Sequence, residues 1–263
     1  GSLGEQVGKA YVAEYFPKIA KTRMDELVAN LKLAMGDRIR GNEWMSPDTK
    51  QAALDKLERM DVMVGYPEKF RDYSQLPMSP DDLYGNMVAA TKFNADYAMS
   101  DLGKPVDRKK WGMNPQTVNA YFHPMKNEIA FPAAILQPPF YHKELHEVQF
   151  CVDVGCGPEH LDAVNFGAIG AVIAHEITHG YDDQGRKFDD CGNIADWWQE
   201  ADAELFKAKT QLMKQQAEQY VYVDADNGAT HKMNGELTMG ENLADLGGMS
   251  LAVQALEQRL KGT

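Results

Sequence analysis

The first part of the chain places apolar side chains three and four positions apart, the spacing that lines one face of an α-helix. This spacing predicts helices over residues 3–15 and 18–40, separated by Pro17, because proline interrupts a helix. The apolar stripe of the second helix consists of Met24, Leu27, Val28, Leu31 and Met35. We interpret these faces as core packing.

Two Ser-Pro pairs predict the starts of further helices. A serine hydroxyl can cap the first backbone N–H groups of a helix, and proline is tolerated in the first turn. Ser46-Pro47 is therefore expected to open a helix to about residue 60, and Ser79-Pro80 a helix to about residue 100. Residues 1–110 are predicted to be a helical segment.

The pattern changes after residue 110. Two short strands are predicted over residues 117–123 and 127–131, joined by a turn. An extended peptide can add to the edge of such a hairpin by main-chain hydrogen bonds, but an ordinary hairpin has the same pattern, and both readings stay open. Residues 137–162 are predicted to be a loop, and a long helix is expected from Asp196 to about residue 222.

Residues 175–179 read His-Glu-Ile-Thr-His and follow an apolar run of small residues. A helix places His175 and His179 on nearly the same face, so both imidazoles can reach one cation. Glu176 lies beside them and can act on a water that such a cation holds. Two hydrogen-bonded core histidines are the alternative, but the carboxylate of Glu176 would then need a buried partner. The pattern predicts a zinc site.

A catalytic zinc ion takes three protein ligands and keeps one position open. Residues 234–248 are predicted to begin a helix after Gly235, and this helix carries Glu241 and Asp245 four positions apart. Glu241 can complete a site of two histidines and one glutamate, and Asp245 can accept the second N–H of a ligand imidazole. A solvated acidic helix face is the alternative, which the surrounding Gly, Ala, Leu and Met residues disfavour.

Composition narrows the class of protein. The chain has 263 residues and a formal net charge of −12, which argues against a nucleic-acid partner. No apolar run is long enough to span a bilayer, and no signal peptide is expected from the first residues. Three cysteines are too few for a disulfide framework, so a Cys151–Cys156 bridge and free thiols both stay open.

Three segments together are similar to one known family. They are residues 175–185 (HEITHGYDDQG), 235–248 (GELTMGENLADLGG) and 118–122 (VNAYF), the last followed by residues 127–140. In the same order, they resemble the neprilysin and endothelin-converting-enzyme family of zinc endopeptidases, including its PepO-like members. The resemblance covers residues 111–248 and reaches more weakly toward the N-terminus.

This resemblance implies a mostly helical α+β fold with a thermolysin-like core, in which a small sheet lies beside the zinc helix. It implies one zinc ion per chain, bound by His175, His179 and Glu241. Residues 111–263 would form the catalytic core and residues 1–110 would pack on it, in one continuous domain.

The resemblance also implies roles for residues around the metal. Glu176 would be the general base, and Asp245 would be catalytic, with an orienting role first and proton donation second. Asn119 and Ala120 would bind the substrate backbone. Asp182 would be a carboxylate beside a ligand histidine, whereas the residues alone would explain it as part of a helix-ending turn.

The expected function is that of a zinc-dependent endopeptidase acting on oligopeptides. One alternative is a zinc-binding but inactive fragment or pseudoenzyme that serves as a binding module. Another is a structural helical domain without metal. Zinc bound at about one ion per chain, and lost in His175→Ala, would exclude this alternative. The peptide sequence preference and the physiological substrate are not predicted.

Family members are much longer than this chain. They carry a large helical domain before the core and a histidine and an arginine after the segment that resembles residues 235–248. We therefore expect a fragment, whose partner is the remainder of its own chain and whose uncovered apolar surface favours self-association. Light scattering that shows a monomer would contradict self-association. The resemblance favours an extracytoplasmic location, as a periplasmic, secreted or membrane-anchored ectodomain, over the cytoplasm.

Overall fold

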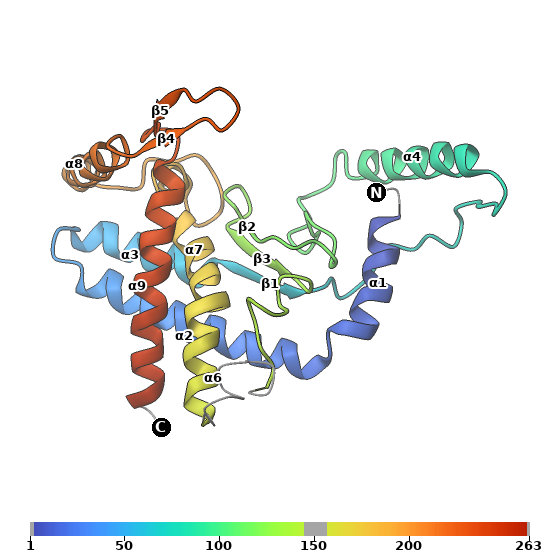
Figure 1. Cartoon of the computed structure of the whole chain (residues 1–263), viewed down its shortest axis with the longest axis horizontal. Helices are drawn as coiled ribbons and strands as arrows, with labels where there is room; N and C mark the ends of the chain where they lie inside the picture. Colours follow the sequence, from blue (N-terminus) through green and yellow to red (C-terminus); the bar gives the residue numbers. More distant parts are fainter. Residues whose placement is uncertain (1–2, 145–156, 262–263) are drawn as a thin grey trace.

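The computed structural model describes residues 3–144 and 157–261, arranged as Figure 1 shows. The mostly helical α+β fold predicted from the sequence is confirmed, with helices around a small sheet. The helices are α1 (Gly4–Tyr15), α2 (Lys18–Gly41), α3 (Pro47–Arg59), α4 (Leu83–Met99), α6 (Pro158–Asn165), α7 (Ala171–His179), α8 (Glu200–Ala217) and α9 (Met239–Lys261). The strands are β1 (Asp61–Gly65), β2 (Tyr121–His123), β3 (Glu128–Pro132), β4 (Val221–Val223) and β5 (Thr230–Lys232).

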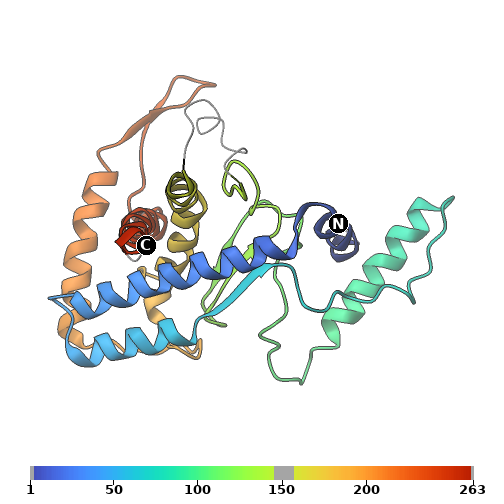
Figure 2. The same cartoon turned by 90° about the horizontal axis from the view of Figure 1, so that it is seen from below.

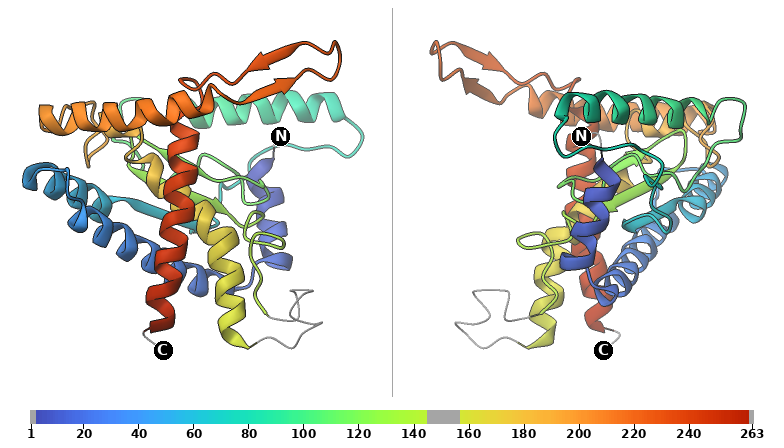
Figure 3. Two further views of the ribbon diagram at one scale, coloured as in Figure 1. Left: turned by 60° about the vertical axis from the view of Figure 1, so that its left-hand side comes forward. Right: turned by 90° about the vertical axis from the view of Figure 1, so that its right-hand side faces the viewer.

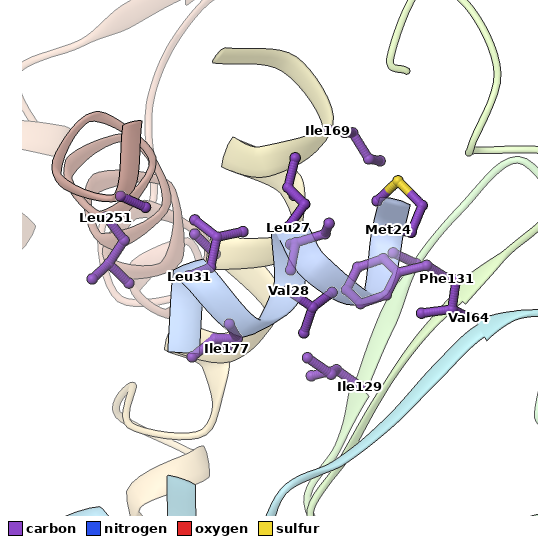
Figure 4. Close-up of a cluster of buried hydrophobic side chains, with 14 of the residues drawn as sticks. Met24, Leu27, Val28, Leu31, Val64, Ile129, Phe131, Ile169, Ile177 and Leu251 are labelled. Atoms are coloured by element: carbon purple, nitrogen blue, oxygen red, sulfur yellow. The ribbon is translucent and has the colours of Figure 1, made fainter. Parts of the chain in front are cut away.

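Helix α2 supplies the centre of the hydrophobic core (Figure 4). Its predicted apolar stripe is buried, except that Met35 is half-buried. Leu31 lies toward Leu251 of α9 and Ile177 of α7, whereas Val28 lies toward the sheet. The regularly spaced apolar side chains of α2 therefore form the surface on which α7 and α9, the two helices of the candidate site, pack.

Helices α7 and α9 approach each other very closely, because glycines of α9 face α7. A Cβ atom on Gly248 would lie 2.7 Å from the carbonyl oxygen of Ala171, and one on Gly247 would lie 2.4 Å from the Thr178 hydroxyl oxygen. Any side chain at these two positions would push the helices apart. The contacts also show that the start of α9 lies beside the end of α7, as the left view of Figure 3 illustrates.

The sheet beside these helices has the strand order β1-β3-β2. Strand β1 runs parallel to β3, with Asp61 opposite Glu128, and β2 runs antiparallel to β3, with Tyr121 opposite Ala130. The predicted hairpin is present, but β2 covers residues 121–123 instead of 117–123. In this register Asn119 would pair with Pro132, which has no N–H group to continue the ladder.

Strand β1 was not predicted from the sequence. It follows α3 almost directly and has only five residues, so its local pattern does not distinguish it from the end of a helix. It pairs with β3, which lies more than sixty residues later in the chain. The division between residues 110 and 111 stays a prediction.

Several helix boundaries differ from those predicted. Ser46 caps α3 as expected, but α4 begins at Leu83, where the carboxylate of Asp82 accepts a hydrogen bond from the backbone N–H of Gly85 at 2.8 Å. Residues 158–162 belong to helix α6, not to a loop, because Pro158 occupies a position suited to the first helical turn.

Helix α8 is shorter than predicted at both ends. It begins at Glu200, because the indole N–H of Trp197 donates to the carbonyl of Phe188 at 3.0 Å and holds the preceding residues outside the helix. It ends at Ala217, because residues 221–223 form β4 and pair with β5.

Some segments lie apart from the core. Helix α4 extends to one side of the molecule, as Figure 2 shows, and the β4–β5 hairpin projects beyond the start of α9. Among the described residues, none of the helices combines the length and the hydropathy needed to cross a bilayer. The possible bridge between Cys151 and Cys156 lies outside the described residues.

We predict that Leu31→Ala lowers the free energy of unfolding by about 2–5 kcal/mol, since the side chain is fully buried between three elements. Leu33→Ala on the same helix is the matched control, because Leu33 is 62% exposed and its removal should cost less than about 0.5 kcal/mol. Urea denaturation measures both values. Equal losses in the two variants would contradict the placement of α2.

Candidate metal centre

The two packed helices bring three predicted metal ligands together. His175 and His179 lie in the second half of α7, and Glu241 lies in the first turn of α9. The Oε2 atom of Glu241 is 3.3 Å from Nε2 of His175 and 3.6 Å from Nε2 of His179. One ligand atom from each of the three residues lies within 4.8 Å of the others. Two residues four apart on α7 thus meet a third that is more than sixty positions later in the sequence.

The opposite nitrogen of each imidazole contacts a carboxylate. Nδ1 of His175 lies 2.8 Å from Oδ1 of Asp245, and Nδ1 of His179 lies 2.7 Å from Oδ2 of Asp182. Because an ionised carboxylate only accepts hydrogen bonds, each Nδ1 carries a proton and each neutral ring keeps its lone pair on Nε2. Both lone pairs therefore face Glu241, as a shared cation requires.

This donor set fits a zinc ion. Two imidazole nitrogens and one carboxylate oxygen are a common ligand set of catalytic zinc, with carboxylates behind the imidazoles. The ion would be held by His175, His179 and Glu241. The side chain of Glu241 is 70% exposed, so the fourth position would be open to solvent and substrate.

The two supporting carboxylates differ in how firmly they are held. The side chain of Asp245 is 76% exposed and that of Asp182 is 6% exposed. Oδ1 of Asp182 also accepts hydrogen bonds from the backbone N–H groups of Gln184 at 2.8 Å and Gly185 at 2.7 Å. Asp182 is therefore fixed by the turn that follows α7, whereas Asp245 is held chiefly by His175.

Burial and the neighbouring carboxylates change the pKa of His179. Burial alone would lower the pKa of His179, but the hydrogen bond and the negative charge of Asp182 outweigh it and raise this pKa above its usual value. A more basic imidazole is also a stronger metal ligand once it is deprotonated.

Glu176 occupies the position of a buried base. It is 8% exposed, and burial raises the pKa of its carboxyl group above the usual value, against the opposing effects of His179 and His175. The backbone N–H of Phe122, on the edge strand β2, provides a hydrogen bond to its carboxylate. Glu176 thus has the buried partner that a carboxylate at this position needs.

A cavity of about 970 Å³ opens beside these groups. One wall is the segment of Asn119 and Ala120 with the strand β2, and another is formed by Leu237, just before α9, and Gly240, in the first turn of α9. Asn119 is exposed, and its Oδ1 accepts a hydrogen bond from the backbone N–H of Ala120 at 2.9 Å. The predicted substrate-binding residues and the predicted metal ligands therefore line one cavity.

Sequence reasoning missed two parts of this arrangement. The contact from Phe122 to Glu176 is made by a backbone N–H, which leaves no signature in the side chains. The wall formed by Leu237 and Gly240 depends on how α9 begins, and small and apolar residues carry no chemical signal of their own.

A family model described as "Peptidase family M13" matches residues 119–263, and a second one with the same description matches residues 1–67. The fold is thus that of a zinc-metallopeptidase family with a thermolysin-like core. The chain belongs to peptidase family M13.

Named relatives agree with this assignment. The chain is 35% identical over 260 residues to an endothelin-converting enzyme homolog of Locusta migratoria, covering 96% of this chain and 33% of the relative. It is 36% identical over 271 residues to endothelin-converting enzyme 1 of Rattus norvegicus, covering 99% and 32%. The chain thus spans about a third of the length of these relatives.

Solved structures agree as well. The zinc metalloprotease Zmp1 of Mycobacterium tuberculosis, in complex with an inhibitor, matches with a TM-score of 0.84 and 44% identity, covering 99% of this chain and 37% of that one. PepO from Lactobacillus rhamnosis matches with a TM-score of 0.82 and 34% identity, covering 97% and 38%. The family implies a zinc cofactor.

We predict that Asp182→Ala weakens zinc binding about 10–100-fold, because His179 loses the carboxylate that fixes its ring and its tautomer. Asp183→Ala is the matched control: Asp183 lines the same cavity, but its carboxylate bonds to the side chain of Gln184. Competition with a chromophoric chelator measures both dissociation constants. If the two variants bind zinc equally well, Asp182 does not support the metal centre.

Proposed function

We propose that this chain carries the active centre of a zinc-dependent endopeptidase that hydrolyses peptide bonds of oligopeptides. The observation that carries the proposal is the convergence of two imidazole Nε2 atoms and one carboxylate oxygen within 4.8 Å, beside a buried glutamate. Family membership supports it, and relatives are named as endothelin-converting enzymes, neprilysins and a zinc metalloproteinase.

One zinc ion per chain would be held by His175, His179 and Glu241. When bound, such an ion polarises a peptide carbonyl and makes a bound water more acidic. The protein's part is to aim the three ligand atoms at one point. Asp182 and Asp245 do this for the two imidazoles, and we assign Asp245 an orienting role first and proton donation second.

Glu176 is the proposed general base. Its carboxylate takes a proton from the attacking water and later passes that proton to the leaving amine. The raised pKa of Glu176 suits this task, because a carboxylate that holds a proton more readily takes it from water more readily. Glu176 lines the same cavity as the proposed zinc ligands.

The proposed substrate is an extended peptide that lies along the cavity. Strand β2 is the edge of its sheet in the described part of the chain, so an extended peptide can add beside it where the backbone groups are not already used. Asn119 and Ala120 precede this strand and line the cavity, which supports a role in binding the substrate backbone. A peptide held there would pass the metal centre.

A zinc-binding chain without turnover is the second candidate. The chain spans about a third of the length of its relatives, which keeps this candidate in view. Both candidates use the same metal centre and differ only in whether peptides are cleaved. That the chain is part of a longer protein, and that it lies outside the cytoplasm, stay predictions.

Self-association also stays a prediction. Three apolar side chains at helical spacing on α9 are between 54% and 57% exposed: Leu246, Met249 and Val253. They form an uncovered stripe on the helix that carries Glu241, and this stripe supports the prediction.

We predict that the chain binds about one zinc ion and that Glu176→Gln keeps the ion but abolishes peptide hydrolysis. The amide retains the shape of the side chain but cannot take a proton from water. Zinc content is measured by elemental analysis, and hydrolysis with a quenched-fluorescent peptide library. His175→Ala should lose the zinc ion, whereas His231→Ala should keep it, because His231 is exposed on β5.

Each result separates the candidates. Hydrolysis that survives in Glu176→Gln would contradict the role of this base. Zinc bound at one per chain without hydrolysis in the unaltered chain would favour the second candidate. Zinc retained in His175→Ala would contradict the proposed metal centre, on which both candidates depend.

We predict that Asn119→Ala lowers kcat/KM for peptides about tenfold, since one hydrogen bond to the substrate backbone would be lost. Zinc content should stay unchanged, because the side chain of Asn119 bonds to the backbone of Ala120 and, among the described residues, to none of the proposed ligands. Val118→Ala is the matched control, since Val118 is adjacent but 64% exposed and outside the cavity wall. Equal kinetics for both variants would exclude Asn119 from substrate binding.

A further inference from the structure

Lys56 is fully buried, which is unusual for a lysine. It lies in the last turn of α3, and its ammonium group donates hydrogen bonds to the carbonyl oxygens of Gly185 at 2.8 Å and Phe188 at 2.7 Å. No carboxylate lies within 4.0 Å of it among residues 3–144 and 157–261. The hydrogen bonds of this ammonium group therefore go to the backbone of one turn, at Gly185 and Phe188.

Aromatic rings complete the surroundings of this ammonium group. The centroids of Phe122, Tyr181 and Trp197 lie 5.7–5.8 Å away. Burial lowers the pKa of Lys56 to about 8, although the negative charges of Asp182, Asp189 and Asp190 oppose this shift. Keeping a cation here is costly, and the cost is offset only through the contacts that the cation makes.

Those contacts lead directly to a proposed zinc ligand. The carbonyl of Gly185 accepts from Lys56, and the N–H of the same residue donates to Oδ1 of Asp182 at 2.7 Å. Oδ2 of Asp182 lies 2.7 Å from Nδ1 of His179. One glycine and one carboxylate thus connect the buried ammonium group to the imidazole.

Gly185 has no side chain of its own that could hold this part of the turn in place. A Cβ atom there would lie 1.8 Å from the carbonyl oxygen of His179, so only glycine fits against the end of α7. Because Gly185 has no side chain of its own, its position depends on the hydrogen bonds of its backbone: its N–H donates to Asp182, and its carbonyl accepts from Lys56 and from the backbone N–H of Phe188 at 3.1 Å.

The backbone of Lys56 is tied to the hairpin that carries the edge strand. Its carbonyl oxygen accepts a hydrogen bond from the side-chain amide of Asn127 at 2.9 Å. Asn127 is fully buried at the hairpin turn and has a φ of 47°, a conformation that asparagine tolerates better than most residues. Lys56 therefore contacts both the turn behind the proposed metal ligand and the turn of the hairpin that carries strand β2.

We propose that Lys56 is a positioning residue for the metal centre: its ammonium group fixes the turn of residues 182–188, and through it the orientation of Asp182 against His179. The inference rests on the zinc centre proposed above. It differs from a purely structural role, in which Lys56 would stabilise the fold without any effect on metal affinity.

The test is Lys56→Met, which keeps the length of the side chain and removes its charge and donors. In the 263-residue chain we expect zinc binding, measured by chelator competition, to weaken about tenfold. In the metal-free protein we expect the backbone amides of Gln184 and Gly185 to exchange with solvent about tenfold faster, as followed by NMR. If this variant does not fold, Lys56→Gln takes its place, since it keeps one donor and loses the charge.

Two comparisons separate positioning from stability. Phe16→Ala destabilises the same core at the junction of α1 and α2, where Phe16 is buried against Tyr66, and should leave the zinc dissociation constant unchanged. A double variant with Asp182→Ala should bind zinc no more weakly than Asp182→Ala alone, because Lys56 would act through that carboxylate. Unchanged zinc affinity in the lysine variant, or effects that multiply in the double variant, would overturn the proposal.

The two proposals can fail separately. If the unaltered chain binds no zinc, the proposed function is wrong, and amide exchange in the metal-free protein still tests the hold of Lys56 on the turn. If the unaltered chain binds zinc and the lysine variant matches it in affinity and in amide exchange, only the role of Lys56 is wrong.

Discussion

The close approach of α7 and α9 is the constraint on which the rest of the site depends. Gly247 and Gly248 let the helices meet almost backbone to backbone, and any side chain there would separate them. The distances of 3.3 and 3.6 Å from Glu241 to the imidazoles exist only at this separation. The site is therefore specified as much by two residues that lack side chains as by the residues that would bind the metal.

The antiparallel arrangement also suits the charges. Glu241 lies in the first turn of α9, near the positive end of that helix dipole, and His179 lies in the last turn of α7, near a negative end. Each of these two residues thus lies at the helix end whose dipole favours its charged form. The proposed zinc ligands are presented by helix ends that meet, and the cavity opens where those ends face the edge strand.

The predictable parts of this arrangement are those in which all the residues belong to one helix. The four-residue spacings of His175 with His179 and of Glu241 with Asp245 follow from helix geometry, and so does the stripe of α2. The length of β2 was not predictable, because it depends on Pro132 across the sheet. The start of α8 depends on the contact of Trp197 with Phe188, and neighbours distant in sequence cannot be read from a local pattern.

Lys56 shows a second case in which the sequence indicates a feature but not the distant residues that it contacts. It shares the buried face of α3 with Ala53 and Leu57, so its position in the period marks it as a charge among apolar residues. That signal says that a partner is needed, but not which one. The partners turned out to be two carbonyl groups of a turn that lies more than a hundred residues later.

The electrostatic balance of the centre follows from these contacts. Four carboxylates surround two imidazoles: Glu176, Asp182, Glu241 and Asp245. The nearby charge of Glu241 adds to burial in raising the pKa of Glu176, so these carboxylates repel one another. A divalent cation at the point where the imidazoles meet would offset two of these charges, and its binding would stabilise the folded chain. The groups that orient the imidazoles thus also create the field that attracts the ion.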